Sequence, residues 1–182
     1  MCAAAESHLS IRHARQSEIS LLNVLMTRAI EQLLKPYLSS EQIAASHEIM
    51  GIDTQLIEDG TYFVAEFGRT VAGCGGWSRR ATHFGGDHSR GRDSRLLDSL
   101  KDAARVRAMY THPDFARRGV GRAILARCEQ VAATEGFRSA TLVATLSGVP
   151  LYRACGYSDV ESFDEITPSG VAVPLIRMRK NL

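Results

Sequence analysis

The feature of the sequence that most constrains its fold is a strand pattern that leads through a glycine-containing turn into a helix pattern. Residues 105–111 are β-rich and stop before Pro113, and residues 119–135 show the clearest helical spacing in the chain. The apolar positions that this spacing gathers on one face are Ile124, Leu125, Cys128, Val131 and Ala132. A strand followed by an amphipathic helix is typical of domains in which helices pack on a sheet.

The other periodic segments extend this pattern along the chain. Predicted strands cover residues 10–14, 62–67, 70–77, 141–145, 157–162 and 171–178. One predicted helix runs from about residue 17 to Pro36, one from a capping-box pattern at Ser39 and Gln42 to Gly51, and a short one over residues 149–155. The order β-α-α-β-β-β-α-β-α-β-β predicts a mixed α/β fold with a single domain at residues 10–182 and a flexible tail at residues 1–9.

Composition favours a reduced, cytoplasmic protein. The 182 residues are 45% hydrophobic and 23% charged, which suits one globular domain with a substantial core. The four cysteines show no C-x-x-C pair and no zinc-site spacing, so we expect free thiols. No apolar run is long enough to span a bilayer and no signal-peptide pattern is present, so we expect no membrane partner.

Positive charge is concentrated in the middle of the chain. Residues 79–122 contain eleven Lys and Arg against five Asp and Glu, whereas the rest of the sequence is net acidic. A nucleic-acid-binding protein usually has a larger basic excess, with aromatic side chains interspersed for stacking. We therefore expect no nucleic-acid partner and favour a smaller anionic ligand.

Residues 78–102 have no periodicity and predict a long surface loop, with a helical turn near residues 96–100. Arg79 and Arg80 from this loop, together with Tyr37 and Trp77, are candidate substrate-binding residues, and arginines suit acceptors that carry carboxylate or phosphate. A solvated face or a homodimer contact explains the loop arginines equally well. His83, Asp87 and His88 could also form a metal cluster, but loop histidines at this spacing are usually solvated, so we expect no metal.

The turn before residues 119–135 carries the strongest chemical signal. Gly119 and Gly121 open the helix, where free N–H groups and the helix dipole attract anions, and three arginines at positions 117, 118 and 122 add positive charge. The turn is not a P-loop, because no Gly-Lys-Ser/Thr follows, and it lacks the third glycine of the dinucleotide fingerprint, where Ile124 stands. A phosphate cradle and a simple helix start with solvated arginines both remain open.

Two motifs together resemble a known family. Arg117-Arg118-Gly119-Val120-Gly121 follows a predicted strand, and Tyr152-Arg153-Ala154-Cys155-Gly156-Tyr157 follows some thirty residues later. This pair, at this distance, is similar to the motifs of the GNAT superfamily of acyl-CoA N-acyltransferases, and the predicted strand order agrees with that family over residues 10–180. The chain departs from the family pattern at Ala116, where Gln or Arg is usual, and at Thr145 and Gly148, where Asn and Ala are common.

The resemblance implies a GNAT-like fold, with a mixed sheet splayed between its fourth and fifth strands and helices on both faces. It implies acetyl-CoA as co-substrate, an amine of a small molecule or peptide as acceptor, and direct attack through a tetrahedral intermediate. It places Tyr152 as the general acid for the departing thiolate, and an N–H near Met109 against the thioester carbonyl. The cofactor-binding residues it implies are Met109, Tyr110, Thr111, Arg117, Arg118, Gly119, Val120, Gly121, Arg122 and Thr145.

The general base is not determined by the sequence. Candidates are Glu31, Glu66, His83, His88 and His112, and a water relay is an equal alternative. A module that senses CoA or a nucleotide without catalysis would also explain the glycine-containing turn, although it would leave Tyr152 without a role.

Overall fold

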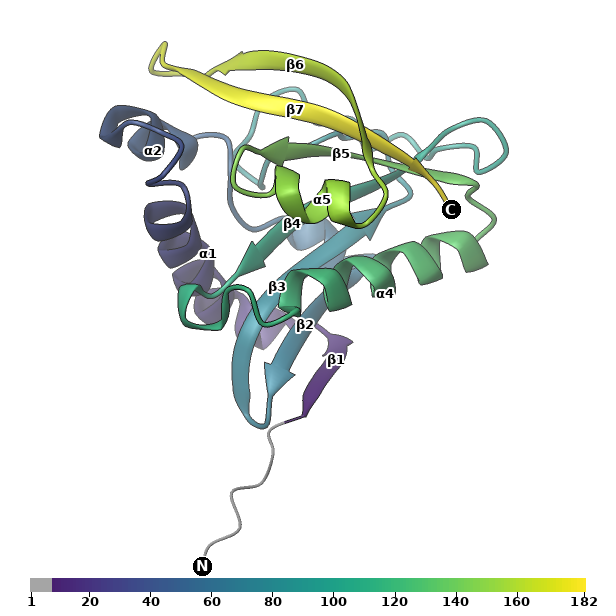
Figure 1. The fold of residues 1–182 in the computed structure, drawn as a ribbon. Helices are drawn as coiled ribbons and strands as arrows, with labels where there is room; N and C mark the ends of the chain where they lie inside the picture. The colour runs from purple at the N-terminus through teal and green to yellow at the C-terminus, as the bar shows by residue number, and fades with distance from the viewer. Residues whose placement is uncertain (1–7) are drawn as a thin grey trace, which may run out of the picture.

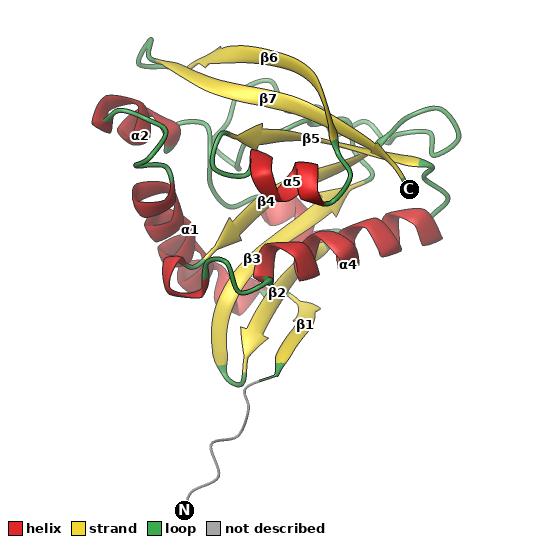
Figure 2. Ribbon diagram, in the orientation of Figure 1, coloured by secondary structure: helices red, strands yellow, loops and turns green. Residues whose placement is uncertain are grey.

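The computed structural model describes residues 8–182, which form a seven-stranded sheet with helices on both faces (Figures 1 and 2). The strand order is β1-β2-β3-β4-β5-β7-β6, and only β4 and β5 are parallel. The strands are β1 (Leu9–His13), β2 (Tyr62–Phe67), β3 (Thr70–Ser78), β4 (Ala104–Thr111), β5 (Ser139–Thr145), β6 (Ser158–Ile166) and β7 (Ala172–Asn181). Mixed α/β architecture is confirmed. Of the predicted tail, residues 1–7 lie outside the described residues, and Leu9 already belongs to β1.

Helices α4 (Val120–Thr134) and α5 (Val149–Ala154) cover one face of the sheet, as Figure 1 shows. Helices α1 (Ile19–Leu33), α2 (Ser40–Ser46) and α3 (Thr54–Glu58) pack on the other face. Two short 3-10 turns, η1 (Gln16–Glu18) and η2 (Pro113–Phe115), precede α1 and follow β4. Within residues 8–182, none of the helices is long and apolar enough to cross a membrane.

The local sequence signals explain where these helices begin. The predicted capping box is present, because the Gln42 N–H donates to Ser39 Oγ at 3.2 Å and the Ser39 N–H donates to Gln42 Oε1 at 3.1 Å. Gly119 caps α4 with a positive φ of 82°, a conformation that favours glycine. Helix α3 was not predicted, since it has only five residues; Asp53 caps it by accepting the Gln55 N–H at 3.2 Å.

Strands β4 and β5 diverge, as the family resemblance implied. Their pairing is limited to Ala104 with Ala140 and Arg105 with Thr141, although β4 continues to Thr111 and β5 to Thr145. Beyond Arg105, the backbone groups of β4 that face β5 therefore have no partner strand. The splay leaves a gap between β4 and β5 in the middle of the sheet. This gap widens toward the carboxyl ends of the two strands, near the start of α4 (Figure 1).

A β-bulge in β4 redirects the side chains that border this gap. Gly76 pairs with Arg107 and Cys74 with Tyr110, so that Gly75 alone lies opposite Ala108 and Met109. Ala108 has a positive φ of 51°. Because one extra residue reverses the alternation, Met109 lies on the α4 face and Tyr110 on the α1 face.

The long loop differs from its prediction. Arg80 and Leu96 form an isolated antiparallel bridge, and the helical turn expected near residues 96–100 lies two residues later, closed by the Asp102 N–H on the Asp98 carbonyl at 2.7 Å. The Thr82 N–H donates to the Asp93 carbonyl at 3.0 Å. The two arms of the loop therefore pair with each other, which holds residues 82–93 over the sheet.

Candidate active site

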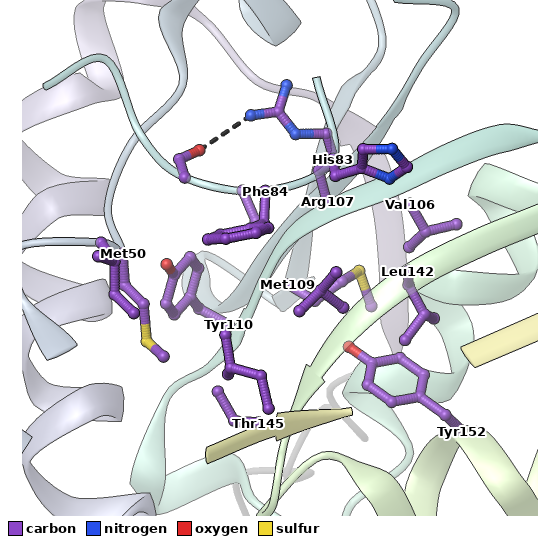
Figure 3. A pocket seen from close by; sticks show the side chains of 15 residues that line it. Met50, His83, Phe84, Val106, Arg107, Met109, Tyr110, Leu142, Thr145 and Tyr152 are labelled. Atoms are coloured by element: carbon purple, nitrogen blue, oxygen red, sulfur yellow. Dashed lines mark hydrogen bonds between the residues drawn. The ribbon is translucent and has the colours of Figure 1, made fainter. Parts of the chain in front are cut away.

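The gap between β4 and β5 contains a pocket that both strands line (Figure 3). Met109 and Tyr110 come from β4, and Tyr152 comes from α5. Further walls are formed by side chains from β5, from the segment after α2 and from the long loop: Leu142, Val143, Thr145, Ile49, Met50, His83 and Phe84. Most of this lining is apolar, which suits the exclusion of water from a reacting group.

The pocket continues as a groove to the start of α4. A second hollow shares Met50, Met109, Tyr110 and Thr145 with the pocket and adds Leu33, Thr111 and Ser147. A third hollow shares those last three residues and extends to Arg117, Gly119, Gly121 and Arg122. This groove therefore connects the predicted anion cradle with the predicted catalytic tyrosine.

The cradle has space at its glycines. A Cβ added to Gly119 would meet nothing within 4 Å, so the approach to the first turn of α4 is open. Gly121 is closely packed instead, since a Cβ there would lie 2.8 Å from Leu151 Cδ2. Arg117 and Arg122 line this end of the groove, and neither has a carboxylate within 4 Å among the described residues. The free helix N–H groups and two uncompensated guanidinium groups favour an anion.

The guanidinium group of Arg118 does not line this cradle. Its guanidinium carbon lies 4.4 Å from the ring centroid of Phe67 and 5.0 Å from that of Phe115, in cation–π contact. It is not among the residues that line the groove. The positive charge at the cradle therefore comes from two of the three predicted arginines.

Tyr152 lies at the inner end of the groove. Its side chain is 7% exposed, and Figure 3 shows its hydroxyl directed toward Met109 and Leu142. Burial raises the pKa of Tyr152 above its usual value, so the phenol keeps its proton at neutral pH. Gly148 leaves room for this ring, because a Cβ at Gly148 would lie 2.9 Å from Tyr152 Cε2. The departure from the family's usual alanine thus matches the position of the tyrosine.

The four predicted substrate-binding residues are not brought together. Trp77 is fully buried and packs on Phe137 with ring centroids 5.8 Å apart, so an acceptor cannot reach it. Arg79 forms an ion pair with Glu135 at 2.6 Å, and Arg80 pairs with Asp59 at 2.7 Å, both outside the groove. Tyr37 is exposed but lines the cradle end rather than the pocket.

The structure separates the five candidate bases. Glu66 forms an ion pair with Arg12 at 2.6 Å, Glu31 lies 4.0 Å from His47, and His88 contacts the His47 carbonyl at 3.0 Å. His112 lies 2.9 Å from Arg28 Nη1, on the α1 side of β3. None of these four lines the pocket that holds Tyr152.

His83 does line that pocket, and it also borders the neighbouring cavity on the loop side. Its side chain is solvent-exposed on one side. Partial desolvation and the nearby charges of Arg105, Arg177 and Arg107 lower the pKa of His83 below its ordinary value. The imidazole is therefore neutral at physiological pH and can accept a proton.

Several residues of the site were missed by the sequence analysis. Met50 and Phe84 line the pocket; Met50 lies at the end of the helix predicted up to Gly51, and Phe84 lies in the long loop without periodicity. Arg107 donates to the Gly85 carbonyl at 2.9 Å, the hydrogen bond drawn in Figure 3, and thereby holds the loop against β4. The two arginines of this strand, Arg105 and Arg107, were the only signal in its sequence. Among residues 8–182, no three His, Cys, Asp or Glu side chains are grouped so that they could hold a metal ion.

Comparisons with known proteins agree with this geometry. Residues 58–159 match the family model described as an acetyltransferase (GNAT) domain. The fold is similar to a GCN5-related N-acetyltransferase from Rhodopseudomonas palustris, with TM-score 0.71 and 16% identity over 100% of both chains. It is similar to the paia N-acetyltransferase from Thermoplasma acidophilum in complex with coenzyme A, with TM-score 0.64 and 14% identity over 96% of this chain and 99% of that one.

A further similar structure is the acetyltransferase yncA from Salmonella typhimurium with its cofactor acetyl-CoA, with TM-score 0.62 and 16% identity over 96% of this chain and 94% of that one. At these identities the likeness shows the fold. A search of curated protein sequences finds no match to the chain.

Proposed function

Because the chain belongs to the acetyltransferase (GNAT) family, whose co-substrate is acetyl-CoA, we propose that it transfers the acetyl group to a primary amine by direct attack through a tetrahedral intermediate. The single observation that carries this proposal is the groove that runs from the cradle at Gly119 to the hydroxyl of Tyr152. A small-molecule or peptide amine is the proposed acceptor. A cytoplasmic location and a homodimer stay predictions.

The residues of the groove fit the parts of acetyl-CoA. The open space at Gly119 and the unpaired charges of Arg117 and Arg122 suit a pyrophosphate. The unpaired backbone of β4 beyond Arg105 suits the amides of the pantetheine arm, which need hydrogen-bond partners. Thr111 and Thr145 border this part of the groove from the two splayed strands.

The backbone of β4 is the proposed electrophilic element. Near Met109, an N–H that faces the gap would donate to the thioester carbonyl and stabilise the oxyanion that forms on attack, a contribution of about 3 kcal/mol for one such donor. The bulge at Ala108 is held by the Tyr62 hydroxyl, which donates to the Ala108 carbonyl at 2.8 Å. Because this contact is rigid and buried, the donor is fixed before the substrate arrives.

Tyr152 is the proposed general acid. As the C–S bond breaks, the phenol gives its proton to the thiolate. The attacking nitrogen still carries an extra proton in the tetrahedral intermediate, and this proton passes through water to the tyrosinate, which leaves a neutral amide and a neutral phenol. The burial that raises the pKa of Tyr152 also disfavours a thiolate beside it, so the pKa of the thiol rises in the same pocket.

His83 is the proposed general base. It borders both the pocket of Tyr152 and the solvent-facing cavity from which an acceptor would enter. An ammonium that enters on this side gives one proton to the neutral imidazole and becomes a nucleophilic amine. The lowered pKa of His83 keeps the imidazole available at neutral pH.

The test is thiol release from acetyl-CoA with a library of amines, followed by mass measurement of the acetylated product. Amine-dependent release with a product heavier by one acetyl group supports the proposal. Binding of CoA without release with any amine would favour the non-catalytic sensor module instead. Absence of CoA binding would exclude both functions.

A further inference from the structure

A second cavity opens from the pocket on the side away from the cradle. It shares Ile49, His83 and Phe84 with the pocket. Its remaining walls come from the long loop, the base of β4 and the end of β6. Since the cradle end of the groove is taken by the co-substrate, this cavity is the remaining approach to the reacting centre.

Arg105 of β4 lines the wall of this cavity, and its guanidinium group forms no ion pair among the described residues. Its Nε is buried and has no hydrogen-bond partner, and its Nη1 donates only to the Ala103 carbonyl at 3.3 Å. No carboxylate lies within 4 Å of its guanidinium group among residues 8–182. A partly buried guanidinium without a counter-ion is unfavourable, which the lowered pKa of Arg105 reflects.

Arg107 lies two residues further along the same face of β4 and has the acidic partner that a buried arginine normally has. Its Nη1 lies 2.6 Å from Asp53 Oδ2, and its Nη2 donates to the Gly85 carbonyl. Arg79, Arg80 and Arg92 of the long loop have acidic partners as well. Arg105 therefore lacks the carboxylate partner that these four arginines have.

The surroundings of Arg105 strengthen its attraction for an anion. Arg95 and Arg177 lie close enough to lower its pKa by repulsion, and Asp102 is the acidic neighbour. Arg90 and Arg95 line the same cavity. Three acids also line the cavity: Asp93 pairs with Arg95 at 3.9 Å, Glu48 accepts the Ser169 N–H at 2.9 Å, and Glu165 stands at the β6 rim, so that Arg105 and Arg90 are the guanidinium groups of the lining without an ion pair among the described residues.

We infer that Arg105 binds an anionic group, a carboxylate or a phosphate, on the same small molecule that presents its amine to His83. This inference rests on the proposed function and adds the substrate class. Arg105 lies four residues before Met109 on β4, at most about 13 Å along the strand because the bulge at Ala108 shortens this span. The amine and the anion of the acceptor are therefore separated by several bonds, as in an ω-amino acid.

The experiment compares matched acceptors in the thiol-release assay. An ω-amino carboxylate series and the corresponding ω-amino phosphonates are measured against their neutral carboxamides, with the intact chain and with Arg105→Gln. We expect KM for an anionic acceptor to lie about ten- to a hundredfold below that of its carboxamide. Arg105→Gln removes this difference by raising KM for the anion toward that of the carboxamide. The better of carboxylate and phosphonate identifies the anion.

Arg138→Gln is the matched control, because Arg138 is exposed, has no ion pair among the described residues and lines none of the hollows described above. It should leave both KM values unchanged. Equal KM values for anionic and neutral acceptors in the intact chain would overturn the inference, and so would a preference that survives Arg105→Gln. Either result leaves acetyl transfer itself intact, whereas transfer to no amine would remove the proposed function.

Discussion

Arg107 and Asp53 form an ion pair at 2.6 Å whose side chains are 2% and 0% exposed. Asp53 also pairs with Arg92 at 2.7 Å and caps α3 through the Gln55 N–H. One buried carboxylate therefore links β4, the start of α3 and the long loop. This link fixes the loop wall of the pocket, including His83, relative to the splayed strands.

Removal of this carboxylate should be costly. Asp53→Asn keeps the size of the side chain but leaves Arg107 as an unpaired buried charge, so we expect a loss of about 3–5 kcal/mol in the free energy of unfolding. Urea denaturation measures it. Glu161→Gln is the control, because Glu161 pairs with Arg177 at the exposed edge and should contribute less than about 1 kcal/mol. Equal effects of the two changes would mean that the buried pair does not anchor the loop.

Tyr152→Phe tests the general acid. The change removes one hydroxyl and keeps the ring that packs on Gly148, so the fold and CoA affinity should be retained. We expect kcat to fall by about 10²–10⁴-fold with little change in Tm. Tyr157→Phe is the control, since Tyr157 is also buried and contacts the Tyr152 ring but does not line the pocket. A Tyr152→Phe protein with normal kcat would assign the hydroxyl a structural role.

The pH profile tests His83. The base works only when unprotonated, so kcat/KM should fall as pH drops through the pKa of His83. Because desolvation and nearby arginines lower that pKa, this acid limb should lie below the ordinary histidine value of about 6.5. His83→Gln should lower kcat/KM and remove the limb, whereas His88→Gln should retain it. An unchanged profile in His83→Gln would favour the water relay.

The parts of the site that were predictable are those encoded by adjacent residues. The two glycines of the cradle, the strand before them and Tyr152 lie in short motifs, and the splay between β4 and β5 followed from the family that these motifs indicate. The capping box at Ser39 is likewise local. Such features depend on a few neighbouring side chains, so the sequence displays them directly.

The parts that were missed depend on distant partners. Trp77 was assigned to the acceptor side, but β3 is covered by helices on both faces, so alternation along the strand could not show that Trp77 is buried. Arg79 and Arg80 were assigned to substrate because arginines suit anionic acceptors, and no spacing in the sequence reveals their pairing with Glu135 and Asp59. Arg105 was treated only as a strand residue, since its missing counter-ion is visible only in three dimensions.

Calorimetric titration of coenzyme A tests the central claim, that the groove beginning at Gly119 holds the acyl donor. Gly119→Glu places a carboxylate in open space against the helix N–H groups, at a φ of +82°. Gly60→Glu is the matched control, because Gly60 has a φ of +69°, equally open surroundings and no place in the groove. The account predicts binding in the intact chain and in Gly60→Glu, and at least a tenfold weaker Kd in Gly119→Glu. Affinity within twofold in all three proteins, or no binding by the intact chain, would contradict it.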